Sequence, residues 1–277
     1  MKIVIADRME PEVVAEIQKL GETVAAPSDL RASVKDADVL IVRSATKVNG
    51  ELLSFAPKLR IVARAGVGLD NVDKAACDKR GIKVLNTPSA SSNAVAELAV
   101  GMMFAASRKL AMADAGMKAK KWLKKEFTGT EIEGKTLGIV GLGRVGSLLA
   151  IKARALGMRI IYFDPHNLTS TIGKSVNLDE LLASSDFVSL HLPLIPETQG
   201  MINAEAIARM KRTGVLINTA RGGLVDEEAL YLALKEGKIA GAALDVYPQE
   251  PYSGKLCELD NIVLTPHIAG STREAQA

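Results

Sequence analysis

The segment from residue 136 to residue 165 constrains the fold of this 277-residue chain more than any other. Its apolar run at 137–140 is too short for a helix and leads into the glycine pattern Gly141-Leu142-Gly143-Arg144-Val145-Gly146. A helical stretch rich in alanine and leucine follows as far as Gly157, and a second apolar run occupies 159–163. This order predicts a strand, a tight glycine turn, a helix and a second strand.

The three glycines have separate roles in a turn of this kind. The first allows the tight bend, the second lets a pyrophosphate approach the backbone, and the third lets the helix pack closely on the strand. The helix N-terminus adds free N–H groups and partial positive charge for the anion. Because the pattern also occurs in plain strand–helix connections, it is a weak signal when it stands alone.

The residue that strengthens the pattern is Asp164, which follows the second strand. A ribose hydroxyl of a bound dinucleotide needs an acceptor at this point. No arginine follows the acid in Pro165-His166-Asn167, and a carboxylate would repel the extra phosphate of NADP. The sequence therefore predicts a dinucleotide site that favours NAD.

Composition excludes several other classes of protein. The net charge of +3 is too small to indicate nucleic acid or an anionic membrane as a partner. Only Cys77 and Cys257 are present, outside any C-x-x-C pattern, so neither a disulfide framework nor a metal site is expected. An acid and an arginine follow within eight residues of Met1, and no apolar run approaches a membrane span. We therefore expect a cytoplasmic protein.

Alternating strands and helices extend on both sides of the glycine turn and predict α/β architecture with parallel sheets. Four β-rich runs precede the turn, at 2–6, 39–43, 61–65 and 83–85. Between them lie helical stretches such as 12–20 and 72–79. A first α/β domain therefore ends near residue 89, before an alanine-rich helix at 90–108 that we expect to be buried between domains or between subunits.

The rest of the chain reads as one dinucleotide-binding domain. Counted from Leu137, just before the glycine turn, six strands are predicted at 137–140, 159–163, 187–192, 215–219, 241–246 and 262–264. The chain then stops within what resembles the first turns of a helix capped by Ser271 or Thr272, so we expect further residues or a truncation there.

Three candidate reactive side chains follow the last three strands: Arg221, Glu250 and His267. In an open α/β sheet, ligands bind beyond the carboxyl ends of the strands. Arginine can hold a carboxylate, histidine can move a proton near neutral pH, and glutamate can orient and charge the histidine. Together they form a site suited to a hydroxy acid or a keto acid.

Structural alternatives stay open for these and other polar residues. Arg221 can cap a loop, and Glu250 can be a surface acid. Of the other histidines, His166 is expected in solvent and His191 in a structural hydrogen bond at a strand end. The lysine run at 118–125 is either a solvated helix end or a patch that meets an anionic substrate.

Several motifs resemble the D-2-hydroxyacid dehydrogenase family. They are Val42-Arg43-Ser44-Ala45-Thr46-Lys47, Arg64-Ala65-Gly66-Val67-Gly68, Asp70-Asn71-Val72-Asp73, Asn86-Thr87-Pro88, the glycine turn, Asn218-Thr219-Ala220-Arg221-Gly222-Gly223, Gly241-Ala242-Ala243-Leu244-Asp245 and Thr265-Pro266-His267. The resemblance covers almost the whole chain. Within the family, the segment that begins at Arg43 most resembles the D-3-phosphoglycerate dehydrogenase branch.

This resemblance implies two doubly wound parallel-sheet domains, with a Rossmann NAD-binding domain (90–267) inserted into a smaller flavodoxin-like substrate domain (1–89, rejoined by 268–277). It implies that Arg221, Glu250 and His267 are the catalytic group. Contacts with NAD are implied for Val67, Gly141, Gly143, Arg144, Val145, Gly146, Asp164, Leu192, Thr219, Ala220, Asp245, Ala269 and Gly270. Several relatives carry a polar residue at position 192, so only a backbone contact is expected there.

The resemblance also implies a substrate site. Its residues are Arg43, Ser44, Arg64, Ala65, Gly66, Val67 and Gly68. The loop at 65–68 would present N–H groups to the substrate carboxylate, and the surplus cations Arg43 and Arg64 would hold a phosphate at the far end of the molecule. A lysine of the 118–125 run from the partner subunit of a homodimer, formed through residues 90–127, would assist.

The implied reaction is NAD-dependent oxidation of D-3-phosphoglycerate to 3-phosphohydroxypyruvate, the first step of serine biosynthesis. The alternatives are a glyoxylate or hydroxypyruvate reductase, another D-2-hydroxyacid dehydrogenase, or an NAD-sensing corepressor that shares the fold. The chain ends before the regulatory domains of some relatives, so feedback inhibition by serine through such domains is not expected.

Overall fold

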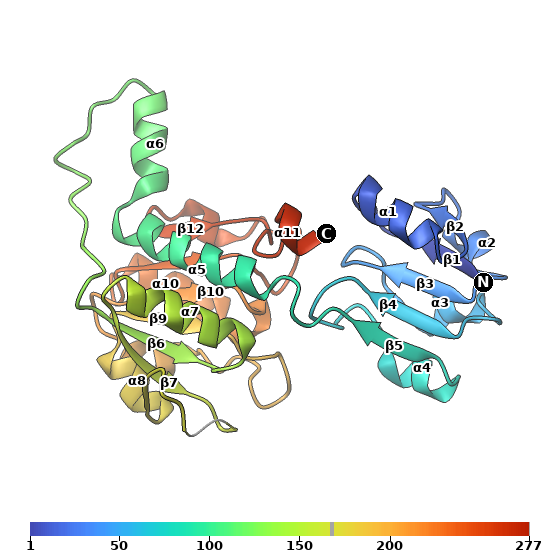
Figure 1. Cartoon of the computed structure of the whole chain (residues 1–277). Coiled ribbons are helices and arrows are strands. Elements are labelled where there is room, and N and C mark those ends of the chain that lie inside the picture. The colour runs from blue at the N-terminus through green and yellow to red at the C-terminus, as the bar shows by residue number, and fades with distance from the viewer. Residues whose placement is uncertain (167–168, 277) are drawn as a thin grey trace. The chain divides into compact units, whose positions relative to one another are not determined.

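The computed structural model describes residues 1–166 and 169–276, which form two compact units (Figure 1). Unit 1 comprises Met1–Ser91 and Gly270–Ala277, and unit 2 comprises Ser92–Ala269. The boundaries expected from the sequence, after residues 89 and 267, each lie two residues before these divisions.

Unit 1 is built on a five-stranded parallel sheet in the order β2-β1-β3-β4-β5. This is the flavodoxin-like order. The strands are β1 (Lys2–Ile5), β2 (Glu22–Ala25), β3 (Val39–Val42), β4 (Ile61–Arg64) and β5 (Lys83–Asn86). The helices are α1 (Pro11–Gln18), α2 (Leu30–Ser33), α3 (Gly50–Ser54), α4 (Lys74–Lys79) and α11 (Arg273–Gln276). The sequence predicted four of these strands and missed β2, an edge strand without a buried residue.

Unit 2 contains a seven-stranded parallel sheet in the order β12-β11-β10-β9-β6-β7-β8. Renumbered from its first strand, this is the dinucleotide-binding order 3-2-1-4-5-6 with one strand added. The strands are β6 (Thr136–Val140), β7 (Arg159–Phe163), β8 (Lys174–Ser175), β9 (Phe187–Leu190), β10 (Val215–Asn218), β11 (Gly241–Leu244) and β12 (Ile262–Leu264). The sequence missed β8, which has only two residues at the edge.

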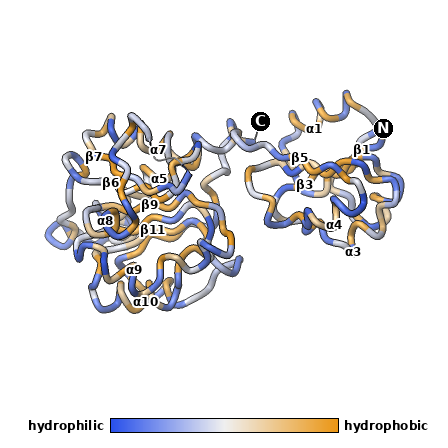
Figure 2. The backbone as a smooth tube through the Cα atoms, turned by 90° about the horizontal axis from the view of Figure 1, so that it is seen from below, coloured by the Kyte–Doolittle hydropathy of each residue, from blue (hydrophilic) through white to orange (hydrophobic). Residues whose placement is uncertain are grey.

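Helices cover both faces of this sheet, as Figure 1 shows. The helices of unit 2 are α5 (Ser92–Ser107), α6 (Leu110–Lys118), α7 (Arg144–Ala155), α8 (Leu178–Ser184), α9 (Ala204–Arg209) and α10 (Glu227–Lys235), with short 3₁₀ turns at Gly222–Leu224 and Lys255–Glu258; all but α6 pack around the sheet. Every residue of β6, β9, β10 and β11 is buried, because a parallel sheet is covered on both faces. Figure 2 shows the matching hydrophobic bands along the strands.

The alanine-rich helix α5 is buried within unit 2, whereas the sequence suggested burial between domains or subunits. Its residues Ala96, Ala99, Met102 and Met103 lie in the core cluster that contains Leu149 of α7. Small alanine side chains let the two helices approach closely. The apolar surface of α5 is therefore explained by packing inside its own unit.

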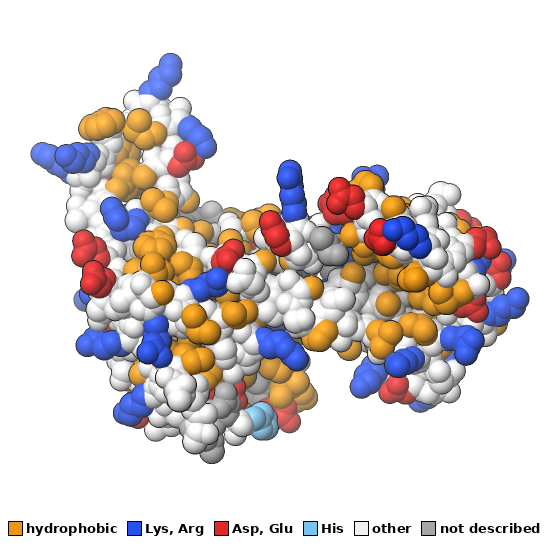
Figure 3. Space-filling model, viewed as in Figure 1, with side chains coloured by type: hydrophobic (Ala, Val, Ile, Leu, Met, Phe, Trp, Pro, Cys, Tyr) orange, Lys and Arg blue, Asp and Glu red, His pale blue; other side chains and the backbone are white. Residues whose placement is uncertain are grey.

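The segment after α5 projects from the rest of unit 2 (Figure 1). Within it, α6 ends at Lys118, whose Nζ lies 2.5 Å from Asp114, and the remainder of the lysine run lies outside any helix. Three large apolar side chains on the segment are exposed: Leu110 (51%), Met117 (55%) and Trp122 (78%). Figure 3 shows hydrophobic and basic side chains together on this projection. No helix among the described residues is long and apolar enough to span a bilayer.

One buried polar group in the core of unit 2 yields a test of stability. Tyr162 of β7 is fully buried, and its hydroxyl has no hydrogen-bond partner among the described residues. Since an unpaired buried hydroxyl costs roughly 1–3 kcal/mol, Tyr162→Phe should raise the free energy of unfolding in urea by about 1 kcal/mol. The hydroxyl of Tyr247 donates to the carbonyl of Thr265 at 3.0 Å, so Tyr247→Phe should lower stability. A loss of stability in Tyr162→Phe would contradict this reading of the core.

Candidate active site

The glycine turn after β6 has the geometry of an anion site. Gly141 has φ +97, and a side chain there would lie 2.9 Å from the carbonyl carbon of His191. A side chain at Gly146 would collide with the carbonyl of Gly141, so the helix can approach the strand only at a glycine. A side chain at Gly143 would meet no atom within 4 Å. Packing therefore requires the outer two glycines, while the middle one leaves open space.

The first turn of α7 faces this open space with uncapped N–H groups. The helix begins at Arg144, and its N-cap residue Gly143 offers no side-chain acceptor. Helix N-termini of this kind bind phosphate groups. The backbone from 141 to 146 could therefore hold the pyrophosphate of a dinucleotide.

Asp164 lies directly beside the turn. Its Oδ2 accepts from the N–H of Leu142 at 2.8 Å, and its Oδ1 accepts from the N–H of His166 at 2.8 Å. These bonds fix the carboxylate at the carboxyl end of β7, where a ribose would require an acceptor. The imidazole of His166 is exposed, as expected, and Asn167 lies outside the described residues.

The histidine and the glutamate expected from the sequence are brought together. Nδ1 of His267 lies 2.8 Å from Oε2 of Glu250, and the other carboxylate oxygen of Glu250 accepts from the N–H of Tyr247 at 3.1 Å. The imidazole is 47% exposed and the glutamate side chain 36%. Because Nδ1 is engaged by the carboxylate, Nε2 is the nitrogen that can exchange a proton with a substrate.

Arg221 follows β10 on a loop held by Asn218. The Asn218 amide donates to the carbonyl of Arg221 at 2.8 Å and accepts from the N–H of Ala220 at 3.0 Å. A side chain at Gly222 would collide with the backbone of Tyr247, so this loop packs on the loop that carries Glu250. The arginine, glutamate and histidine therefore follow three adjacent strands, β10, β11 and β12.

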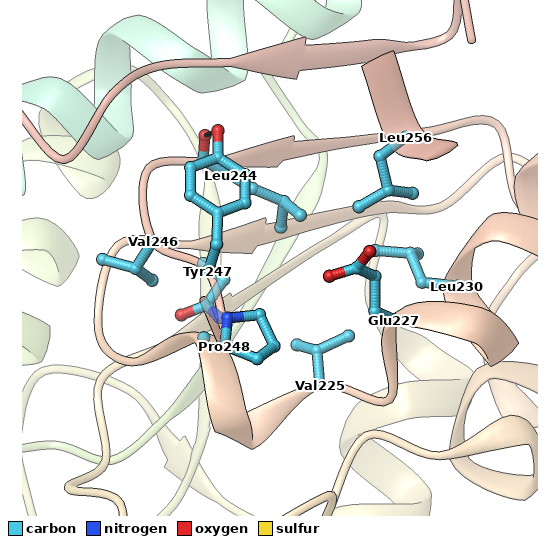
Figure 4. A pocket seen from close by; sticks show the side chains of 10 residues that line it. Val225, Glu227, Leu230, Leu244, Val246, Tyr247, Pro248 and Leu256 are labelled. Carbon is cyan, nitrogen blue, oxygen red and sulfur yellow. Dashed lines mark hydrogen bonds between the residues drawn. The ribbon is translucent and has the colours of Figure 1, made fainter. Parts of the chain in front are cut away.

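The cavity lined by the loops after β10 and β11 cannot hold a substrate. Its volume is about 10 Å³, which is room for a single water molecule. Figure 4 shows Tyr247, Leu244 and Glu227 among the residues around it. Burial raises the pKa of Tyr247 to about 12, and the nearby Asp245 acts in the same direction, so the hydroxyl stays a donor. The ring stacks on Tyr252 with centroids 4.3 Å apart.

The remaining predicted coenzyme contacts in unit 2 lie mostly beyond strand ends. Arg144 and Val145 open α7, Leu192 follows β9, Thr219 and Ala220 follow β10, Asp245 follows β11, and Ala269 follows β12. The buried hydroxyl of Thr219 has no partner among the described residues. Gly270 and Val67 belong to unit 1.

The predicted substrate residues of unit 1 lie on two loops, after β3 and after β4. Asp7 organises the first loop. Its Oδ2 accepts from the N–H of Arg43 at 2.5 Å, and its Oδ1 accepts from the hydroxyl of Thr46 at 2.6 Å. The Asn71 amide donates to the carbonyls of Arg43 and Thr46, each at 2.7 Å. The side chain of Arg43 reaches the carbonyl of Arg8 at 3.4 Å.

The second loop contains Ala65, Gly66, Val67 and Gly68. Gly66 has φ +143, and a side chain there would collide with the guanidinium of Arg64, which lies across this glycine. The N–H of Gly66 donates to Thr87 at 2.8 Å. Asp7 and Thr87 were not predicted as site residues, although each comes just after a strand.

His191 makes the structural hydrogen bond expected of it. Its Nε2 lies 2.9 Å from the hydroxyl of Ser189. Burial lowers the pKa of His191 to about 4, so its imidazole is neutral at pH 7. Among the described residues, no group of His, Cys, Asp or Glu could hold a metal ion.

Comparison with known proteins decides the family. Residues 100–269 match the family described as "D-isomer specific 2-hydroxyacid dehydrogenase, NAD binding domain". The chain belongs to this family. The resemblance, the NAD-binding domain and the two-domain fold inferred from the sequence are thereby confirmed.

Members of the D-2-hydroxyacid dehydrogenase family with different activities are similar to the chain. A D-3-phosphoglycerate dehydrogenase of Methanocaldococcus jannaschii is 45% identical over 286 residues, which cover 100% of this chain and 55% of the relative. A hydroxypyruvate reductase of Thermotoga maritima is 48% identical over 253 residues, covering 90% of this chain and 83% of the relative. The chain thus spans about half the length of the phosphoglycerate dehydrogenase.

Solved structures share the fold over nearly the whole chain. The TT0316 protein from Thermus thermophilus has a TM-score of 0.93 at 34% identity, covering 100% of this chain and 92% of that one. D-Lactate dehydrogenase from Aquifex aeolicus, complexed with NAD and lactic acid, has a TM-score of 0.87 at 32% identity, covering 99% of this chain and 90% of that one.

Proposed function

We propose that this chain carries the active site of an NAD-dependent D-2-hydroxyacid dehydrogenase that oxidises D-3-phosphoglycerate to 3-phosphohydroxypyruvate. The observation that carries the proposal is the 2.8 Å contact between His267 and Glu250, placed at strand ends next to the loop of Arg221. A histidine oriented by a carboxylate is a general base, and an arginine can hold the carboxylate of the substrate.

Each residue of the group has one task in the reaction. Nε2 of His267 accepts the hydroxyl proton of the substrate, and Glu250 stabilises the imidazolium that forms. Arg221 holds the substrate carboxylate and stabilises charge on the oxygen at C2. The glycine turn, the N-terminus of α7 and Asp164 would hold the coenzyme, and NAD bound there would supply the hydride acceptor for the oxidation at C2.

The phosphorylated substrate is supported by two observations. Several relatives that are 42–46% identical to the chain are named D-3-phosphoglycerate dehydrogenase. Arg64 ends β4 and Arg43 directly follows β3, so two arginines lie at the carboxyl ends of adjacent strands in the proposed substrate domain.

A substrate panel tests the proposal. Purified protein with NAD is mixed with D-3-phosphoglycerate, D-glycerate or D-lactate, and the formation of NADH is followed by absorbance. We expect the highest kcat/KM with D-3-phosphoglycerate. NADH formation with none of the acids, together with no reduction of the matching keto acids, would overturn the assignment as a dehydrogenase.

Hydroxypyruvate reduction is the second candidate. It is favoured by the 48% identity to the Thermotoga maritima enzyme, of which this chain matches 83%. The same panel run with NADH and hydroxypyruvate or glyoxylate distinguishes the two. Similar activity on D-glycerate and its phosphate would select the reductase.

The coenzyme preference is predicted from Asp164. Its carboxylate would repel the extra phosphate of NADP, so NAD should be used far better than NADP. Asp164→Ala should lower kcat/KM for NAD and so reduce the ratio of kcat/KM for NAD to that for NADP. The measurement is kcat/KM for both coenzymes, with Asp179→Ala, a surface acid of α8 paired with Arg209, as the control. Equal use of NAD and NADP by the unmodified protein would refute the role of Asp164.

We further propose a homodimer formed through residues 90–127. The exposed apolar side chains of Leu110, Met117 and Trp122 on the projecting segment support it, because apolar groups gathered on one surface mark interaction sites. A second copy of the chain would cover them. Light scattering at micromolar concentration should then give twice the chain mass of 29.4 kDa. A monomer mass at that concentration would rule this interface out.

A further inference from the structure

Asp245 holds the chain on both sides of His267. It follows β11, and its side chain is fully buried. Its Oδ1 accepts from the hydroxyl of Thr265 at 2.6 Å and from the N–H of Ile268 at 2.8 Å, while its Oδ2 accepts from the N–H of Ala269 at 2.8 Å. One carboxylate therefore binds residues before and after the histidine.

The backbone of His267 needs this support. The residue has φ +52, in the left-handed region that residues other than glycine rarely enter. A conformation of this kind persists only where the surrounding structure determines it. The N–H of His267 also donates to the carbonyl of Asp245 at 2.9 Å, so the main chain and the side chain of one residue together shape the turn at 265–269.

We propose that Asp245 is a positioning residue, whose carboxylate fixes the turn at 265–269 and thereby the orientation of the His267 imidazole. The inference rests on the proposed function, in which His267 is the proton acceptor. It differs from the coenzyme contact expected from the sequence. A carboxylate has about four acceptor positions, and three are used inside the turn.

The turn at 265–269 requires a side chain in which two oxygen atoms can both accept hydrogen bonds. Backbone N–H groups approach both Oδ1 and Oδ2, so each oxygen must accept. Asp245→Asn would direct an N–H₂ group at one of these donors and break the arrangement with little change of volume. Thr265→Val removes one hydroxyl at nearly constant shape, and Thr265→Ser restores it.

Kinetics of these variants separate positioning from coenzyme binding. A misplacement of about 1 Å can cost on the order of 10²-fold in rate, so Asp245→Asn should lower kcat about 10²-fold and Thr265→Val about tenfold. Thr265→Ser should recover most of the loss. The dissociation constant of NADH, from fluorescence titration, should stay within about threefold for Thr265→Val and Thr265→Ser, which change the turn without replacing a residue expected to contact the coenzyme. A raised dissociation constant with unchanged kcat at saturating coenzyme would overturn the proposal.

Asp186 provides a matched control in the same sheet. It directly precedes β9 and so lies at the amino ends of the strands, whereas His267 lies beyond their carboxyl ends. Its carboxylate accepts from the N–H of Thr136 at 2.8 Å and from Nζ of Lys211 at 2.9 Å. Asp186→Asn should lower the melting temperature and leave kcat within about twofold. If it lowered kcat as much as Asp245→Asn does, the loss would reflect general destabilisation, and the proposal would fail.

A measurement that needs no turnover completes the test. The chain has three histidines, so ¹⁵N NMR of labelled imidazoles gives few signals. In the unmodified protein, the His267 ring should show one tautomer, with the proton on Nδ1 toward Glu250. In Asp245→Asn and Thr265→Val the signal should move toward an average of both tautomers. Unchanged signals in both variants would reject the positioning role, whereas absent hydroxy-acid turnover in the unmodified protein would reject only the proposed function.

Discussion

Replacing His267 with alanine is expected to lower kcat for hydroxy-acid oxidation by about 10²–10⁴-fold, the usual contribution of a general acid–base. The imidazole lies 2.8 Å from Glu250 and is 47% exposed, so its Nε2 is the group placed to take the substrate proton. Binding of NADH should be retained, because the glycine turn and Asp164 lie elsewhere on the sheet edge. Steady-state kinetics and fluorescence titration measure the two quantities separately.

His166→Ala is the control for this variant. His166 lies in the same unit, and its exposed imidazole has no task in the proposed reaction. Its kcat should stay close to that of the unmodified protein. Near-normal turnover in His267→Ala would disprove the assignment of the proton acceptor.

Glu250→Gln tests whether the pair acts as a unit. The amide can still meet Nδ1 of His267, but it no longer offers a negative charge to the imidazolium that forms during oxidation. We expect a smaller loss of kcat than in His267→Ala. The double variant should be no slower than His267→Ala, because groups that act together are not additive. Multiplied losses in the double variant would show that the two side chains act independently.

The central part of unit 2 could be predicted from the sequence because its signals are local. Gly141 and Gly146 are required by contacts within the turn itself, so the pattern of glycines, apolar runs and Asp164 predicted β6, α7 and β7. The strands β2 and β8 were missed because their sequences carry no such local signal. Each is a short edge strand without a buried residue, and the hydrophobic pattern that marks a buried strand is absent.

The candidate reactive residues were predictable from topology. Strands of a parallel sheet end at one edge, and Arg221, Glu250 and His267 follow neighbouring strands, so the sequence could place them together. The residues that hold their loops were not recognised in that role. Asn218 and Asp245 act through backbone N–H and C=O groups whose positions depend on the folded loops, and spacing along the chain does not encode these contacts.

Arg43→Ala is expected to raise KM for D-3-phosphoglycerate tenfold to a hundredfold, from the loss of one charge-assisted contact of about 1.5–3 kcal/mol. Arg43 comes directly after β3 and is partly buried. Its loop is held by Asp7 and Asn71, so the backbone that carries the guanidinium is already ordered and loses little further entropy when an anion binds. A carboxylate is already held by Arg221 in the proposed reaction, which leaves the phosphate as the partner for Arg43.

The substrate without a phosphate makes this prediction specific. Arg43→Ala should leave kcat/KM for D-glycerate little changed, since that acid offers nothing for the guanidinium to hold. Arg60→Ala is the matched control, because Arg60 precedes β4 at the amino edge of the same sheet and is exposed. It should leave KM for both acids unchanged. An equal rise in KM for both acids in Arg43→Ala would show that Arg43 holds a group common to both substrates, and the case for a phosphorylated substrate would then lose its support in unit 1.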